Sequence, residues 1–127
     1  MGFFSFFKKN TKNSDLDNIL SQFNRENFPQ GNKDIDAGTK EVLFILNDKI
    51  PESEARTIFL RSFAISRISN QFDCNRLKQH LSGYCLQHFT DNQVDKLFTY
   101  LKALNAAKIL HGRTPADITR NGDTYIW

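Results

Sequence analysis

Residues 90–112 read TDNQVDKLFTYLKALNAAKILHG, and this stretch decides the fold class. It opens on a capping-box pattern, in which Thr90 and Gln93 can each bond the other residue's backbone N–H with their side chains. Gly112 follows as a helix-ending residue. Between these signals, apolar side chains recur at the spacing of one helix face, at Val94, Leu97, Phe98, Leu101 and Leu104. The stretch therefore predicts an amphipathic helix that ends near Leu110.

Two further helices are predicted immediately before this one. The segment 73–89 carries apolar side chains on one face, with Gly83 in mid-helix as a close-packing point. The segment 51–69 starts with a proline and has acidic residues in its first turn, both of which are typical of a helix N-terminus. Its apolar residues spread over much of the circumference, so we expect it to be the most buried helix. A stripe of small side chains on it predicts the close approach of a neighbouring helix, at Ser62, Ser66 and Ser69.

The segment 34–50 is ambiguous, because its central run 42–46, VLFIL, fits either a buried strand or an almost uniformly apolar helix. Its length favours a helix, and Pro51 would stop that helix because the residue before a proline disfavours the α region. Upstream, apolar residues at helical spacing predict an amphipathic helix that begins at Ser14 and ends near Asn24. A loop with Pro, Gly and Asn follows it at 27–32.

The C-terminal residues 113–127 predict a short helical turn at 114–117, a turn at 121–123 and an extended end at 124–127, with Trp127 packed against the helices. Taken together, the elements predict an all-α fold, in which residues 13–127 form a single-domain bundle of about five helices. A short amphipathic N-terminal segment, residues 1–12, precedes this domain, and a short extended tail ends it.

The composition describes one ordinary folded domain. The chain has 127 residues, of which 39% are hydrophobic and 24% charged, and this excludes collagen-like, disordered and disulfide-stapled classes. The formal net charge of +3 is far below that of a dedicated nucleic-acid binder. The longest apolar run is the pentapeptide at 42–46, whereas a membrane-spanning helix needs about 20 residues. A signal-peptide pattern is also missing, so we expect a cytoplasmic protein.

The N-terminal residues 2–12 read GFFSFFKKNTK. Projected on a helical wheel, their side chains divide into two distinct sides. One side is aromatic, with Phe3, Phe4, Phe6 and Phe7. The other side is polar and basic, with Ser5, Lys8, Lys9 and Lys12. This pattern is typical of a helix at a membrane interface, where aromatic rings enter the headgroup boundary and lysines meet anionic lipid. Twelve phenylalanines in the chain favour packing on the domain itself or docking on a protein partner over membrane contact. The segment therefore predicts packing on the domain, contact with a partner, or contact with the inner face of a membrane.

The sequence offers no recognisable catalytic or metal centre. Cys85 and His88 share a helix face, but they supply two ligands where a structural zinc ion needs four. The segment 32–36, NKDID, has oxygen ligands at alternate positions, yet Ala37 replaces the glycine that a calcium-binding loop requires. A nucleophile elbow and a phosphate-binding glycine loop are both missing. We therefore expect no cofactor, no metal and no enzymatic activity.

Two hypotheses about function remain. The first is a non-enzymatic helical protein that binds another macromolecule, preferably a protein, in the role of an inhibitor, immunity-type protein or adaptor. The alternative is a DNA-binding module that uses the basic C-terminal part of the chain, with nucleic-acid contacts at Lys108, Arg113 and Arg120. The DNA-binding alternative is the weaker of the two, because the lysines of the helix at 90–112 point in different directions and form no stripe.

Overall fold

In a computed structural model of the chain, residues 25–127 are described. This part contains α3 (Asn32–Ile45), α4 (Glu52–Ile68), α5 (Cys74–Ser82) and α6 (Asp91–His111). Two short 3-10 helices, η1 (Leu86–His88) and η2 (Pro115–Asp117), and two short strands, β1 (Thr119–Asn121) and β2 (Thr124–Ile126), complete it. The protein is mostly helical, which confirms the predicted all-α fold.

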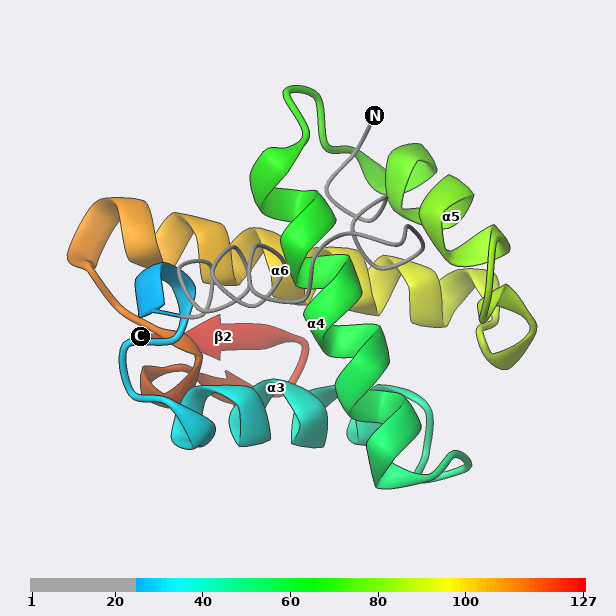
Figure 1. The fold of residues 1–127 in the computed structure, drawn as a ribbon, viewed down its shortest axis with the longest axis horizontal. Coiled ribbons are helices and arrows are strands. Elements are labelled where there is room, and N and C mark those ends of the chain that lie inside the picture. Colours follow the sequence, from blue (N-terminus) through cyan, green and yellow to red (C-terminus); the bar gives the residue numbers. More distant parts are fainter. Residues whose placement is uncertain (1–24) are drawn as a thin grey trace, which may run out of the picture.

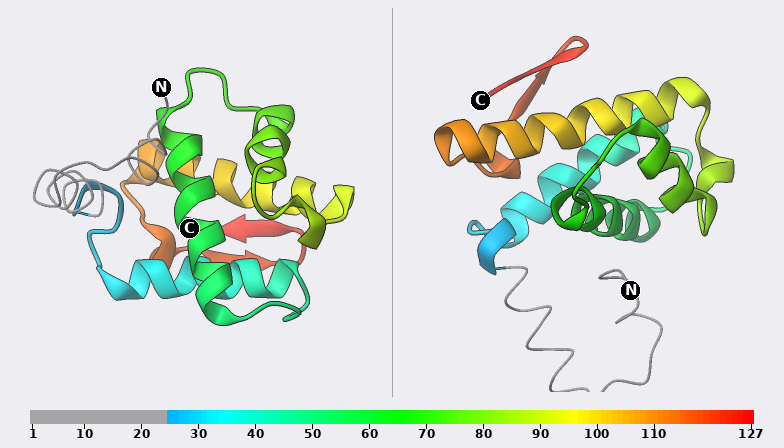
Figure 2. Two further views of the ribbon diagram at one scale, coloured as in Figure 1. Left: turned by 45° about the vertical axis from the view of Figure 1, so that its right-hand side comes forward. Right: turned by 90° about the horizontal axis from the view of Figure 1, so that it is seen from above.

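The helices pack across one another around the two longest, α4 and α6. Figure 1 shows α4 crossing in front of α6, with α3 below and α5 beside them. Seen from above, α4 and the β1–β2 hairpin lie on opposite sides of α6 (Figure 2). The core where these helices meet is apolar, and its fully buried side chains include Val42, Phe59, Phe63, Leu97 and Leu101.

The longest helix, α6, follows the prediction closely. The Thr90 hydroxyl accepts a hydrogen bond from Gln93 N at 3.2 Å, and the Gln93 side chain accepts one from Thr90 N at 2.8 Å. At the other end, Gly112 adopts the left-handed conformation with φ 63°, which a residue without a Cβ reaches at no steric cost. Local sequence is therefore sufficient to set both ends of this helix.

Residues 42–45 of the ambiguous run belong to a helix, but this helix, α3, ends at Ile45, well before the predicted stop at Pro51. The two residues after Leu46 explain the early end, because Asn47 and Asp48 have φ values of 57° and 59°. Asparagine and aspartate tolerate this left-handed region better than other non-glycine residues do.

Upstream, residues 25–27 are helical, so a helix ends three residues later than predicted. The rest of the helix predicted from Ser14 lies outside the described residues.

The segment 73–89 is not one helix, which corrects the prediction. Asp73 caps α5 by accepting a hydrogen bond from Arg76 N at 2.8 Å, and the helix ends at Ser82 with Gly83 as its cap. The chain then turns into η1, and this turn buries Cys85, which is 1% exposed. The free energy gained by burying Cys85 and by bringing η1 back to α4 exceeds the gain from a longer helix, even though the apolar residues continue at helical spacing. Cys74 and Cys85 therefore do not share a helix, and both are free thiols.

The C-terminal tail contains more secondary structure than the extended end that was predicted for it. The predicted helical turn is η2, and the predicted extended residues form β2, which pairs antiparallel with β1. Gly122 takes the first of the two loop positions with φ 63°, as a type II′ hairpin turn requires. Tyr125 packs on Tyr100 of α6 with ring centroids 5.2 Å apart. Trp127, predicted to be packed, remains 38% exposed.

Candidate functional site

A cleft of about 600 Å³ opens between the C-terminal end of α4 and the second half of α6. We call it the cationic cleft. Basic side chains come from both helices, Arg67 from α4 and Lys102 and Lys108 from α6. The remaining lining residues are polar or apolar and comprise Ser66, Ser69, Asn70, Phe72, Asn105 and Ile109. Within residues 25–127, no carboxylate lines this cleft.

Small serines on α4 allow the two helices to approach each other beside the cleft. Ser66 is buried, and its hydroxyl donates to the carbonyl of Phe63 within its own helix at 2.6 Å. The Asn105 amide of α6 donates to the same Ser66 oxygen at 3.3 Å. The predicted serine stripe thus does meet a neighbouring helix, and this contact sets one wall of the cleft.

Arg67 lines the cleft and contacts Phe63 and Asn27. Its guanidinium carbon lies 4.5 Å from the centroid of the Phe63 ring, and Nη1 donates to Asn27 Oδ1 at 3.0 Å. The Nε atom is buried and has no acceptor among the described residues. Burial lowers the pKa of Arg67 to about 10, so the side chain is still charged at neutral pH. The fold therefore keeps a desolvated positive charge here.

The two lysines complete the positive cluster. Lys108 Nζ donates to the Glu26 carbonyl at 3.3 Å, and partial burial and then the Arg67 charge lower its pKa, with Glu26 acting in the opposite direction. Lys102 Nζ lies 5.5 Å from the centroid of the Phe98 ring. Like charges gathered in this way raise the local positive potential, because neither lysine forms an ion pair with a carboxylate of residues 25–127.

Apolar side chains border the same end of the molecule. Ile109 lines the cleft and is 81% exposed, and its neighbour Leu110 is 66% exposed. Ile68, the last residue of α4, is 42% exposed. These are the most exposed large apolar side chains on the described helices apart from Phe44. The main surface feature of this end is therefore a positive cleft that the highly exposed Ile109 lines, with Leu110 and Ile68 exposed at the same helix ends.

A second cleft, of about 660 Å³, lies between α3, α6 and the hairpin, and we call it the hairpin cleft. Its charges are of mixed sign, and two of them, Glu41 and Arg120, form an ion pair. Arg120 lies over the Phe44 ring at 3.4 Å, and its Nε atom is 3.4 Å from Glu41 Oε2. The Tyr125 hydroxyl donates to the same Glu41 oxygen at 2.7 Å. These contacts hold the hairpin on α3, which gives this cleft a structural role.

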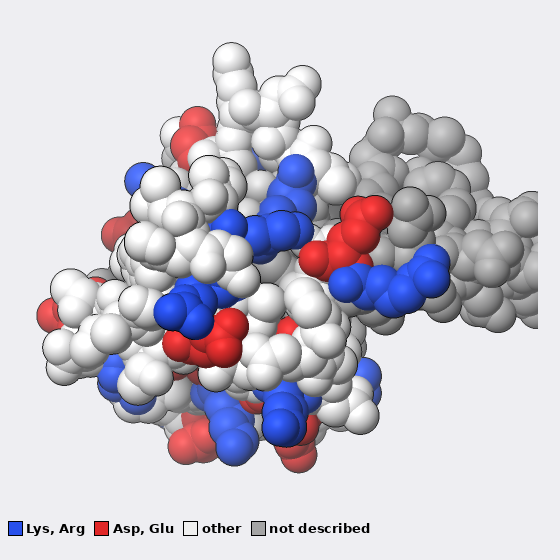
Figure 3. Space-filling model, turned by 90° about the vertical axis from the view of Figure 1, so that its left-hand side faces the viewer, with Lys and Arg blue, Asp and Glu red and all other residues white. Residues whose placement is uncertain are grey.

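The fold does not bring the three predicted nucleic-acid contacts together. Lys108 lines the cationic cleft and Arg120 lines the hairpin cleft, whereas Arg113 follows the end of α6 and lines neither. On the side of the molecule that carries the C-terminal end of α6, basic side chains alternate with acidic and uncharged ones (Figure 3). The arrangement provides no continuous basic stripe on that side.

The groups considered for catalysis or metal binding are used within the fold. His88 Nε2 lies 2.8 Å from Glu54 Oε1, and Cys85 is buried. Both oxygens of Asp34, in the weak calcium-loop pattern, accept hydrogen bonds from the protein. Among the described residues, no group of three or more His, Cys, Asp and Glu is arranged to hold a metal ion.

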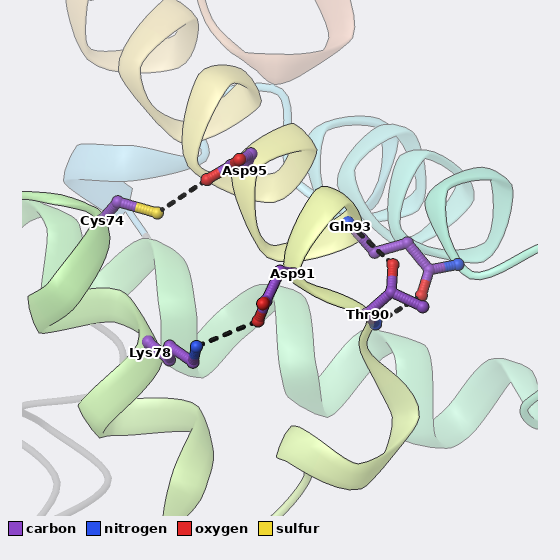
Figure 4. Close-up of polar contacts among 6 residues, drawn as sticks. All are labelled: Cys74, Lys78, Thr90, Asp91, Gln93 and Asp95. Atoms are coloured by element: carbon purple, nitrogen blue, oxygen red, sulfur yellow. Dashed lines mark hydrogen bonds and ion pairs between the residues drawn. The ribbon is translucent and has the colours of Figure 1, made fainter.

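Cys74 lies between α5 and α6, where its thiol donates to Asp95 Oδ1 at 3.0 Å (Figure 4). Burial, followed by this hydrogen bond and the Asp95 charge, raises the thiol pKa to about 11. A nucleophilic cysteine requires the opposite shift. The nearby Lys78–Asp91 ion pair, at 2.9 Å, also joins α5 to α6 and leaves this corner with a structural function.

The residues predicted to contact a partner or membrane, Phe3, Phe4, Phe6, Phe7, Lys8, Lys9 and Lys12, lie outside the described residues. Within the described part, no helix combines the length and apolarity needed to cross a membrane. Sequence patterns alone do not single out Arg67 and Lys102 as site residues. The one available signal was the serine stripe, because Arg67 adjoins the position where a helix was expected to approach closely.

A comparison of the chain with protein-family models, curated proteins and solved structures finds no match in any of the three.

Proposed function

We propose that this chain is a non-enzymatic protein-binding module that docks its partner at the C-terminal ends of α4 and α6. The observation that carries the proposal is Ile109, an isoleucine that is 81% exposed at the edge of a preformed cleft. The exposed Ile68 side chain at the end of α4 extends the apolar area. We define this docking surface as Ile68, Ile109 and the cationic cleft.

The energetics favour a binding role for this surface. Burying a side chain such as Ile109 contributes about 1.5–3 kcal/mol, and the effect is strongest where the side chain fills a partner's pocket. Apolar side chains beside a few fixed polar groups are typical of protein interfaces. The structural roles of Cys74, Cys85 and His88 support a function without catalysis.

Such a module fits the role of an inhibitor, immunity-type protein or adaptor, each of which acts by occupying a surface of another protein. Two free cysteines support action in the cytoplasm, where thiols stay reduced. Contact of the basic, phenylalanine-rich residues 2–12 with the inner face of a membrane is compatible with this role and forms a separate part of the proposal.

Site-specific photo-cross-linking of the full chain in cells tests the docking surface. A photoreactive amino acid at position 109 is expected to give a discrete protein adduct, whereas the same group at position 126 gives none. Ile126 is a matched control because it is also an exposed isoleucine, at 55%, but lies on the hairpin.

The purified partner then allows the surface to be measured directly by calorimetry. Ile109→Asp should weaken binding by about tenfold or more, and Ile126→Asp should leave it within about twofold. Circular dichroism confirms that both variants are folded. Adducts only from position 126, an adduct with nucleic acid or lipid, or unchanged binding by Ile109→Asp would each overturn the proposal.

A further inference from the structure

We infer that the partner segment bound at this surface is acidic, with carboxylates that enter the cationic cleft and an apolar residue that packs on Ile109. This inference rests on the proposed docking surface and specifies the chemistry of its partner. The cleft is about 600 Å³, which is enough room for a few side chains of a peptide but too little for a folded domain.

The charge arrangement of the cleft favours an anion. Arg67, Lys102 and Lys108 come from two different helices and face one cavity, and no carboxylate of the described residues lines it. Two basic side chains outside the cleft do have a carboxylate partner, since Arg120 pairs with Glu41 and Lys78 with Asp91. The cationic cleft differs from these two sites because three basic side chains gather around one cavity that no carboxylate of the described residues lines.

The desolvation of Arg67 strengthens this argument. Its guanidinium is stacked on Phe63 and has a buried Nε without an acceptor in the described chain, so its charge is poorly compensated. A neighbouring anion would favour the charged forms of both Arg67 and Lys108, which burial now disfavours and, at Lys108, the Arg67 charge disfavours as well. The amide and hydroxyl groups of Asn70, Asn105 and Ser69 add polar lining that can donate to carboxylate oxygens.

The surroundings of the cleft favour a protein segment over nucleic acid or a membrane. A nucleic-acid backbone is bound along a stripe of cations, whereas this cluster is confined to one cavity and adjoins the exposed Ile109. Figure 3 shows acidic side chains interspersed with the basic ones on this side, which would repel an extended phosphate backbone. A concave site also cannot lie flat on a bilayer surface. An acidic segment with an apolar anchor matches both the charge and the exposed Ile109.

Fluorescence anisotropy with the full chain tests the inference. The probes are a short fluorescein-labelled peptide of glutamates around a central leucine, and the same peptide with glutamine in place of every glutamate. The acidic peptide should bind at about 50 mM NaCl and be largely released at about 300 mM, because salt screens charged contacts. The glutamine peptide should bind at least tenfold more weakly.

Charge-reversal variants assign the binding to the cleft. Lys102→Glu and Lys108→Glu should each weaken binding of the acidic peptide by about tenfold, with the fold checked by circular dichroism. Lys40→Glu is the matched control, because Lys40 is exposed on α3 outside the cleft and the change in net charge is the same. Its effect should stay within about twofold.

The outcomes separate this inference from the proposed function. If both peptides bind equally and Ile109→Asp abolishes binding, the docking surface stands and the acidic partner is wrong. Equal effects of Lys40→Glu and Lys108→Glu, or no binding of the acidic peptide, also overturn the inference. A short DNA duplex and vesicles containing phosphatidylserine serve as competitors. Binding of either one that is lost in Lys108→Glu, without binding of the acidic peptide, would assign the cleft to that ligand instead.

Discussion

Asp34 shows how a single residue fastens the C-terminal segment of this protein to α3. The side chain is fully buried, and its carboxylate accepts hydrogen bonds from Gln30 N at 2.8 Å, Thr114 Oγ1 at 2.6 Å and Ala116 N at 2.8 Å. These donors lie on both sides of α3 in the sequence. Through these hydrogen bonds, the carboxylate joins η2 to the start of α3.

Asp34→Asn should destabilise the protein by about 3 kcal/mol, because an amide nitrogen would face a buried donor in place of an accepting oxygen. Urea unfolding followed by circular dichroism measures the change. Asp36→Asn is the control, since Asp36 is exposed on the same helix and its replacement should cost less than about 0.5 kcal/mol. Equal stabilities of the two variants would contradict this role of Asp34.

At the scale of the elements, the contact between α3 and α4 depends on the lack of a side chain at Gly38. A Cβ placed there would lie 2.2 Å from Cζ of Phe59, which is fully buried in α4. Phe59 in turn stacks on Phe63 with ring centroids 5.5 Å apart, so the ring has little freedom to move. The two helices therefore approach as closely as they do because residue 38 is glycine.

Gly38→Ala should lower the free energy of unfolding by about 2 kcal/mol, because the overpacking outweighs the higher helix propensity of alanine. Gly83→Ala is the matched control, since Gly83 has φ −75° and its nearest contact is His80 O at 3.5 Å. That change should be neutral or slightly stabilising. In the Gly38→Ala background, Phe59→Leu should cost less than it does alone. Strictly additive effects would show that the two residues do not compete for space.

At the scale of the whole molecule, packing makes the stability sensitive to alkaline pH. Burial raises the pKa of the Tyr84, Tyr100 and Tyr125 phenols above their usual value, and it raises the pKa of the Cys85 thiol to about 11. In the unfolded chain these groups lose their protons at lower pH than in the folded protein. Their contribution to stability is therefore complete below about pH 8 and declines as the pH rises through 9 and 10 towards the folded pKa values.

The free energy of unfolding should fall steadily between pH 8 and pH 10.5, as measured by urea unfolding at constant ionic strength. Cys85 alone accounts for about 2 kcal/mol of the loss, given its shift from 9.0 to about 11. Cys85→Ala should therefore show a shallower pH dependence than the unmodified protein, whatever its stability at pH 8. A flat profile for the unmodified protein would be inconsistent with buried phenols and thiols.

Much of the fold was accessible from sequence because its signals are local. The Thr90–Gln93 capping box, the αL glycine at residue 112 and the periodicity between them lie within one segment and need no distant partner. The turn around Gly122 is encoded in the same local way. The all-α class follows from these signals because they recur along the chain. The predicted contacts of residues 1–12 remain predictions, because they lie outside the described residues.

The break after Ser82 and the candidate site were decided by tertiary structure. The segment 73–89 keeps helical spacing throughout, yet the chain turns so that Cys85 is buried and His88 reaches Glu54. Arg67 and Lys108 are 41 positions apart, and nothing in either local pattern indicates that they face one cleft. Caps and periodicity fix φ and ψ over a few residues, so the sequence by itself determined which segments are helices. Only the packing of α4 on α6 decided which charges meet, because that depends on helix contacts formed across the whole domain.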